Sequence, residues 1–389
     1  RAFFVIEENA PANTLYLDNS GNIGIGENSP DTLLHLKAAQ PKLRIEGTAN
    51  TARDYDIWTD GDEIYIEGVG GSSGAIQIGE NGTFGIQFDL QSSFKLDTNS
   101  RISLSNNDSG GTGGEDSTSG NTILGYLSGA AIASGGLNNT TIGHKAGNAI
   151  STADNNVFIG ALAGSTHLTG SRNTAIGTQA MFNTDADSDS NSSISNVFIG
   201  AQAGGGTWAG ETSNHNIGIG DLALGGALEG GDGTVAIGSS ALGSLTSGAG
   251  NTAVGFEAGK LLTGGVNTII GYQAADALAS GTSNTVIGAR AFGAADGSET
   301  NSVIIGADAG ASINHDSTDG NVIIGHDAGT GGGAATVHCV VIGRNAMNAT
   351  GSNGSTGTVA IGKDALTALT SGAGNTAVGY QALDATTTG

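Results

Sequence analysis

The hydrophobic pattern of this chain repeats from Asn121 to the end of the sequence. The unit reads Asn-Thr-Ala-Ile-Gly-x-x-Ala in residues 173–180 and Asn-Thr-Ala-Val-Gly-Tyr-Gln-Ala in residues 375–382. Fifteen copies carry a marker glycine, and the fourteen intervals from the first to the last cover 254 residues, a period of about 18 residues. A unit this short cannot bury its own apolar face, so the copies must stack. The pattern therefore predicts a parallel β-solenoid, or β-roll, of about 15 coils. The marker glycines are Gly125, Gly143, Gly160, Gly177, Gly200, Gly220, Gly238, Gly255, Gly271, Gly288, Gly306, Gly325, Gly343, Gly362 and Gly379.

Two positions of each unit are rich in β-branched residues. The residue before the marker glycine is Ile, Val or Leu, and the residue three before it is Thr, Val or Ile. These positions share one face of a short strand, which we expect to be the inside of the coil. The residue between them then points outward, although a strand face in contact with water should be polar. We expect another copy of the chain to cover this face; an aggregation-prone surface is the alternative. The apolar residues at this middle position include Ile123, Phe158, Phe198, Ala253, Ile269, Val286, Ile304, Ile323 and Val341.

Three further positions of the unit predict a structural role. Asn stands four residues before most marker glycines, where stacked amides can hydrogen-bond from coil to coil. The marker glycine permits a turn with positive φ, and the Ala three residues later indicates close packing. We expect these columns to hold the fold and to carry no catalysis. Representative members are Asn173, Gly177, Ala180, Asn251, Gly255, Ala258, Asn375, Gly379 and Ala382.

Composition and charge narrow the function classes. The chain has 69 glycines without a three-residue period, which excludes collagen, and a net charge of −23, which opposes binding to nucleic acid or anionic membranes. No apolar run reaches membrane-spanning length. The single cysteine, Cys339, occupies an Asn position and is expected to be a buried thiol. Because the chain begins with Arg1 and stops within the array, we interpret it as a segment of a longer polypeptide.

The chain divides into three predicted zones. Residues 1–105 alternate strand-like runs with turn signals, which indicates a β-rich module. Residues 106–120 are rich in Gly, Ser and Asp and are typical of a linker. Residues 121–389 form the predicted solenoid shaft. The fold class is therefore all-β.

Two segments resemble known fibre proteins. The run Leu15-Tyr16-Leu17-Asp18-Asn19-Ser20-Gly21-Asn22-Ile23-Gly24-Ile25-Gly26, with Ser29-Pro30 and Leu34-His35-Leu36 after it, resembles a segment of phage tail fibres and related bacterial surface proteins. The Asn-Thr-Ala-Val-Gly-Tyr-Gln-Ala-Leu repeat is similar to those fibres and, more distantly, to the head of trimeric autotransporter adhesins, although its coils are longer and vary from 16 to 23 residues. The resemblance implies a left-handed parallel β-roll built as a homotrimer, located outside the cell or on a virion.

The candidate binding residues lie at the turns and in the loops. Exposed aromatic side chains can stack on sugars or contact a receptor, or can simply cover the coil below. Carboxylates at alternate positions resemble the start of a calcium loop, but the later positions depart from that motif, so a solvated acidic loop is the alternative. The histidines form no short-spaced metal pair. The receptor candidates are Tyr126, Trp208, Phe256, Tyr272 and Tyr380, and the calcium candidates are Asp185, Asp187, Asp189 and Asn191.

These observations favour a structural and adhesive fibre that projects loops toward a glycan or protein receptor on a host or cell surface. No cofactor other than the calcium candidate is expected, and no enzymatic activity. The alternatives are a purely structural extracellular filament, a bacterial surface adhesin, and a tailspike glycosidase, which would need paired carboxylates that no distinctive cluster supplies.

Overall fold

The computed structural model describes residues 15–38, 42–45, 55–60, 63–68, 120–132, 136–184, 192–208, 210–315, 318–331, 336–349 and 354–389. The chain divides into two compact units, Arg1–Ser100 and Arg101–Gly389, and each is described by itself. The described residues form strands, turns and loops, with no α-helix among them. The all-β fold class is confirmed.

The first unit contains two small sheets. Strand β2 (Ile23–Ile25) pairs antiparallel with β1 (Tyr16–Leu17) and parallel with β3 (Leu34–Leu36). Strands β4 (Lys42–Ile45), β5 (Tyr55–Asp60) and β6 (Glu63–Gly68) form an antiparallel sheet in that order. The turn between β1 and β2 is closed by Asp18, whose Oδ1 accepts hydrogen bonds of 2.8 Å from the amides of Ser20 and Asn22.

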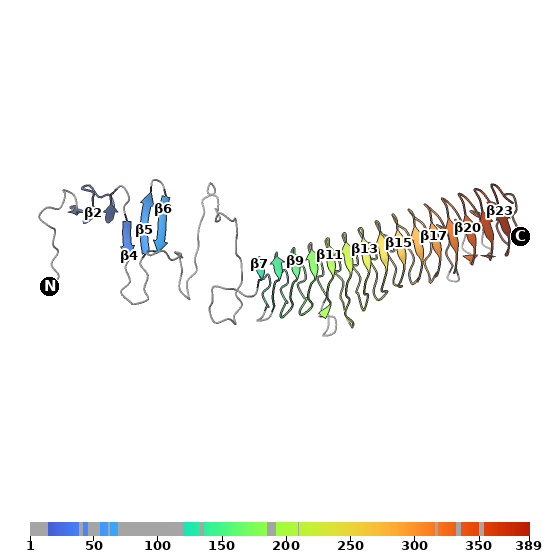
Figure 1. The fold of residues 1–389 in the computed structure, drawn as a ribbon, viewed down its shortest axis with the longest axis horizontal. Helices are drawn as coiled ribbons and strands as arrows, with labels where there is room; N and C mark the ends of the chain where they lie inside the picture. The colour runs from blue at the N-terminus through green and yellow to red at the C-terminus, as the bar shows by residue number, and fades with distance from the viewer. Residues whose placement is uncertain are drawn as a thin grey trace. The chain divides into compact units, whose positions relative to one another are not determined.

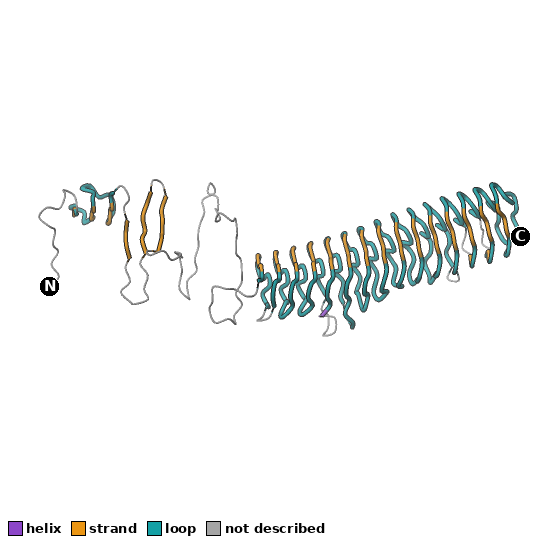
Figure 2. Tube along the Cα trace, viewed as in Figure 1, coloured by secondary structure: helices purple, strands orange, loops and turns teal. Residues whose placement is uncertain are grey.

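The second unit is a parallel β-solenoid in which each coil contributes one short strand to a 15-stranded sheet (Figures 1 and 2). Every strand ends just before a marker glycine, and every neighbouring pair is parallel and in register, as Ile269 opposite Val286 illustrates. The predicted solenoid is thereby confirmed. The strands are β7 (Thr122–Leu124), β8 (Thr140–Ile142), β9 (Val157–Ile159), β10 (Thr174–Ile176), β11 (Val197–Ile199), β12 (Ile217–Ile219), β13 (Val235–Ile237), β14 (Thr252–Val254), β15 (Thr268–Ile270), β16 (Thr285–Ile287), β17 (Val303–Ile305), β18 (Val322–Ile324), β20 (Val340–Ile342), β22 (Val359–Ile361) and β23 (Thr376–Val378), with β19 (Thr336–Val337) and β21 (Ser355–Thr356) pairing separately.

The two faces of each strand are the reverse of those predicted. The middle residue, such as Phe158 or Ile269, is fully buried inside the coil, while the first and third residues point outward. Both sets are apolar, so a period of two could not tell inside from outside. The interior is narrow, and in places a large side chain fills the space left by a small residue of the next coil. The ring of Phe198 occupies the space beside Gly218, where an added Cβ would lie 2.7 Å from it.

The core of the coil is completed by two further columns. The Ala column, from Ala146 onward, is buried as predicted. A second column lies in the connecting loops, seven or eight residues after the marker glycine, and it was not foreseen. It is buried because the loop folds back across the open side of the coil. Its members are Ile150, His167, Trp208, Leu228, Leu245, Leu262, Leu278, Ala295, Ile313 and Leu369.

The Asn column forms the predicted ladder. The side-chain oxygen of Asn156 accepts a 2.8 Å hydrogen bond from the amide of Asn173, whose Nδ2 donates to the carbonyl of Ser193 at 2.9 Å. The side chain of Asn173 and its backbone amide thus tie neighbouring coils together, and the same pattern recurs at Asn139, Asn156 and Asn196. Cys339 replaces Asn in this column but keeps the backbone hydrogen bond to the preceding Asn, since its amide donates to Oδ1 of Asn321 at 2.9 Å. The thiol is buried as predicted, and burial raises the pKa of Cys339.

The marker glycines sit where coils touch most closely. Their φ values lie between +128° and +145°. A Cβ on Gly255 would clash with the carbonyl group of Gly271 in the next coil. The glycine is thus required both by the turn and by the spacing between coils.

Candidate functional site

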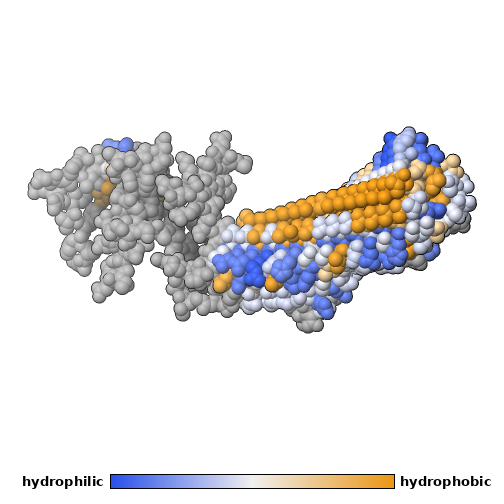
Figure 3. Space-filling model, turned by 45° about the vertical axis from the view of Figure 1, so that its right-hand side comes forward, coloured by the Kyte–Doolittle hydropathy of each residue, from blue (hydrophilic) through white to orange (hydrophobic). Residues whose placement is uncertain are grey.

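The outward positions of the fifteen strands form one continuous apolar stripe (Figure 3). The stripe consists of the third residue of each strand, which is Ile, Val or Leu, and the first, which is Thr, Val or Ile. None of these positions holds a charged residue, although 13 basic and 36 acidic residues occur in the chain. Ile237 and Ile270 are each 38% exposed despite their neighbours above and below. The stripe is the part of the described surface that is least suited to water.

The stripe is long and narrow. Fifteen strands at about 4.8 Å spacing give a length of roughly 67 Å, and two columns two residues apart are about 7 Å wide. The flat area is on the order of 500 Å², and its accessible area is larger because the side chains stand up from it. Stable protein interfaces bury about 800 Å² on each partner. A monomer that left this stripe in water would expose an unusually long apolar row.

Beside the stripe runs the column of residues that follow the marker glycines, and it holds four of the five predicted receptor-contact residues. Their exposed fractions are 70% for Tyr126, 45% for Phe256, 50% for Tyr272 and 67% for Tyr380. Residues of adjacent coils stack in this column, as Phe256 and Tyr272 do with ring centroids 5.5 Å apart and planes 13° apart. These side chains are accessible to a ligand.

Trp208, the fifth candidate, lies elsewhere. It is fully buried in the loop column and meets Phe198 edge to face, with centroids 5.7 Å apart. Its loop folds inward over the coil, so the indole is part of the core. The structure therefore corrects the prediction that Trp208 is placed for receptor contact.

The next column, two residues after the marker glycines, is a polar ladder that the sequence did not reveal. Gln202 donates to the side-chain oxygen of Gln179 at 2.9 Å, and Gln273 donates to Glu257 at 2.8 Å. Every residue of this column has a positive φ, as in Gln273 at +51°. The repeated backbone turn thus places this side chain at the same position of every coil, and it is polar in every coil except those of Leu127, Leu162 and Leu222.

The strongest link of this ladder is an arginine–carboxylate pair. Arg290 donates to both oxygens of Asp308, through Nε at 2.8 Å and through Nη2 at 2.9 Å. The Arg290 guanidinium holds the pKa of Asp308 below its usual range, with the charge of His326 acting in the same direction. The two groups are therefore fixed in place on the surface.

A hollow of about 310 Å³ lies next to this pair. Its floor is made of small residues, Gly293, Ala294 and Ala311, and its rim is polar. Burial, with a smaller contribution from the charge of Glu257, raises the pKa of Asp276 on this rim. The rim residues are Gln273, Asp276, Arg290 and Asp308.

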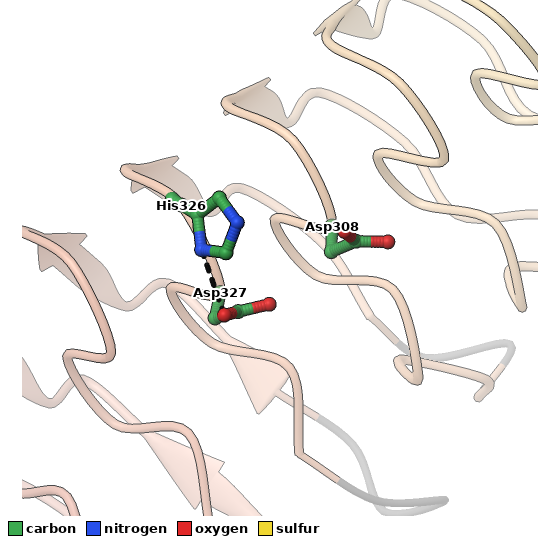
Figure 4. Close-up of side chains that lie close together, drawn as sticks. All are labelled: Asp308, His326 and Asp327. Atoms are coloured by element: carbon green, nitrogen blue, oxygen red, sulfur yellow. Dashed lines mark ion pairs between the residues drawn. The ribbon is translucent and has the colours of Figure 1, made fainter.

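Asp308 also approaches a histidine and a second carboxylate (Figure 4). His326 and Asp327 lie on one coil, with Nδ1 2.7 Å from Oδ2, and Asp308 lies on the adjoining coil. One ligand atom from each of the three residues lies within 4.8 Å of the others. Arg290 already binds both oxygens of Asp308, and its positive charge opposes a cation there. We therefore assign no metal to this cluster.

The predicted calcium residues Asp185, Asp187, Asp189 and Asn191 lie outside the described residues.

Neither protein-family models, nor curated proteins, nor solved structures show a match to this chain. Within the described part of the chain, no helix has the length and apolar character needed to cross a membrane.

Proposed function

We propose that this chain is the shaft of an extracellular attachment fibre, of the phage tail fibre or adhesin type, in which three copies pack in parallel through the apolar stripe. The single observation that carries the proposal is the uncharged, β-branched outer face of the in-register sheet. Covering this face removes apolar surface from water, which is the main driving force for association.

A second and third copy of the same chain are the occupants that best suit the stripe. Side chains on both surfaces must interdigitate over a length of roughly 67 Å, which requires the same spacing of about 4.8 Å on both. A parallel copy has that spacing at every coil. The charge supports this choice too, because contact through an uncharged surface adds the least repulsion between copies of a chain with a net charge of −23. Three copies around an axis follow the adhesin heads that the repeat resembles.

The surface outside the stripe is then available for recognition. The exposed aromatic column and the polar ladder lie after the turn that ends each strand, and three copies would present each feature three times. Three weak sites on a rigid shaft give strong attachment to a surface, because binding of the first raises the effective concentration of the others. The mechanical role of the shaft would be to hold these sites at a distance from its anchor.

The mass of the particle in solution tests the proposal. We expect sedimentation and native mass measurement to give three times the chain mass of 38.1 kDa. Ile270→Lys places a charge within the stripe and should release monomers. Leu261→Lys is the matched control, because Leu261 is 47% exposed but lies in a loop outside the stripe. A stable wild-type monomer, or equal behaviour of the two variants, would contradict the proposal.

A further inference from the structure

We propose that the hollow bounded by Gln273, Asp276, Arg290 and Asp308 binds one unit of a neutral saccharide, with Tyr272 as a stacking platform at its edge. The inference rests on the proposed attachment function for its biological meaning. The inference adds the chemical class of the receptor and the place on this chain where that receptor binds.

The hollow lies where a small position of the coil stands beside the Arg290–Asp308 pair. The fifth residue after the marker glycine is Gly293 or Ala311 in the coils that line it, whereas other coils hold Lys260, Thr330 or Thr367 there, or a glycine such as Gly243 without this pair. The space has a volume of about 310 Å³, which is at the lower end of the range for small-molecule sites. The size is that of one sugar ring rather than of a peptide or a lipid.

The rim supplies hydrogen-bonding groups that are already fixed. Two of the five N–H donors of Arg290 go to Asp308, so the remaining donors of the guanidinium can meet hydroxyl groups. Gln273 is tied to Glu257 by its Nε2. An ideal Cβ on Gly293 would lie 3.7 Å from Oδ1 of Asp276, which places that carboxylate next to Gly293 in the hollow. Donors and acceptors held in this way suit a ligand with several hydroxyl groups.

An apolar face stands next to these polar groups. Tyr272 immediately precedes Gln273, is half exposed, and is held by its stack on Phe256. The amide of Arg290 donates to the carbonyl of Tyr272 at 2.8 Å, which places Tyr272 beside a residue that lines the hollow. The C–H face of a pyranose ring packs on such an aromatic surface while its hydroxyls reach the polar side.

The charge balance favours a neutral ligand. Asp276 and Asp308 face a single guanidinium within the hollow, with Glu257 and Lys260 as a pair close by. A carboxylated or phosphorylated sugar would meet net negative charge, and a cation would be repelled by Arg290 at the Asp308 side, where both carboxylate oxygens are already bound. Uncharged hydroxyl groups avoid both penalties.

The test uses the full chain and saturation-transfer NMR with the methyl glycosides of glucose, galactose and N-acetylglucosamine. We expect transfer to at least one of them. Gly293→Thr fills the hollow with a side chain that the fold accepts at Thr330 and Thr367, and Tyr272→Ala removes the platform. Each should weaken binding by about tenfold or more. Gly243→Thr, at the same position of another coil, and Tyr380→Ala, another exposed tyrosine of the same column, should bind like the wild type.

The possible results separate this inference from the fibre proposal. No transfer to any of the three glycosides, unchanged binding by Gly293→Thr, or binding of choline in preference to the sugars would overturn it. The mass of each sample is measured alongside. A trimer that binds no glycoside contradicts only the saccharide site, whereas a monomer that binds through the hollow contradicts only the trimer.

Discussion

His167 shows how one residue can change the properties of a repeated core. Its position in the loop column holds Leu in Leu245, Leu262 and Leu278, yet the imidazole is fully buried there. Nε2 donates to the carbonyl of Gly170 at 3.1 Å and Nδ1 faces the hydroxyl of Thr184 at 3.2 Å. Burial lowers the pKa of His167 to about 4 from 6.5. The cause is the loss of water around a charged ring, which the hydrogen bond to Gly170 offsets only in part.

This pKa makes stability depend on pH in a defined window. As pH falls through 6.5 the unfolded chain binds a proton at this residue, while the folded chain does so only near pH 4. Stability is therefore lost between these values, by roughly 3 kcal/mol for this residue. We expect His167→Leu to remove that contribution, so the difference in unfolding free energy between the variant and the wild type changes across pH 6.5 to 4. Denaturant unfolding at several pH values measures it, with the exposed His144→Gln as control; a pH-independent difference for His167→Leu would contradict the assignment.

The backbone conformation of single residues was the feature hardest to predict from the sequence. Leu222 has a φ of +55°, a conformation in which Gly or Asn would be expected. Its amide donates to the carbonyl of Ala201 in the preceding coil at 3.0 Å. The same bond recurs along the array, so stacking of coils overrides the local preference. The residue type at this position, leucine, does not reveal the hydrogen bond that its amide makes to the preceding coil.

At the scale of the strand and its turn, sequence columns predicted more than single residues did. The repeat predicted three features correctly. These are the positions of the strands, the Asn ladder and the close-packed Ala column. The faces of the strand did not follow from the repeat, because Phe198 and Ile199 are equally apolar and only packing against Gly218 shows which is inside. The loop column was missed because the loops differ in length. Counting forward from each marker glycine would have aligned Leu245, Leu262 and Leu278.

The marker glycine gives a direct test of coil spacing. In Gly255→Ala the new methyl group meets the backbone of Gly271 and also occupies a strained φ of +141°, so we expect a loss of roughly 2–4 kcal/mol. Gly379→Ala has a similar φ of +132°, but the nearest atom to its Cβ is 3.9 Å away, so it should lose only about 1–2 kcal/mol. Hydrogen exchange of amides in the two mutated coils measures the local loss. Equal protection in both variants would show that φ alone selects the glycine.

At the scale of the whole molecule, the candidate surfaces emerge from the stacking of columns. The stripe was predicted as a second apolar face, although its residues were assigned to the wrong side. The hollow could not be predicted, since it needs Gly293 and Ala311 in one column beside Arg290 and Asp308 in another. The residues of the two coils meet only after the coils have stacked. Sequence alone shows that the residues vary but not that they share a surface.

The balance between apolar contact and charge predicts how salt acts on the assembly. The stripe has no charged residue, whereas each chain carries a net charge of −23, so association brings like charges together. Raising ionic strength from 0.01 to 1 M shortens the Debye length from about 30 Å to about 3 Å and weakens this repulsion. We expect the trimer to become tighter with salt and as pH falls toward the isoelectric point near 4.3 until the loss of folding stability takes over. Sedimentation of dilute protein at several ionic strengths measures the dissociation constant. Weaker association at high salt would mean that ion pairs, rather than the apolar stripe, hold the chains together.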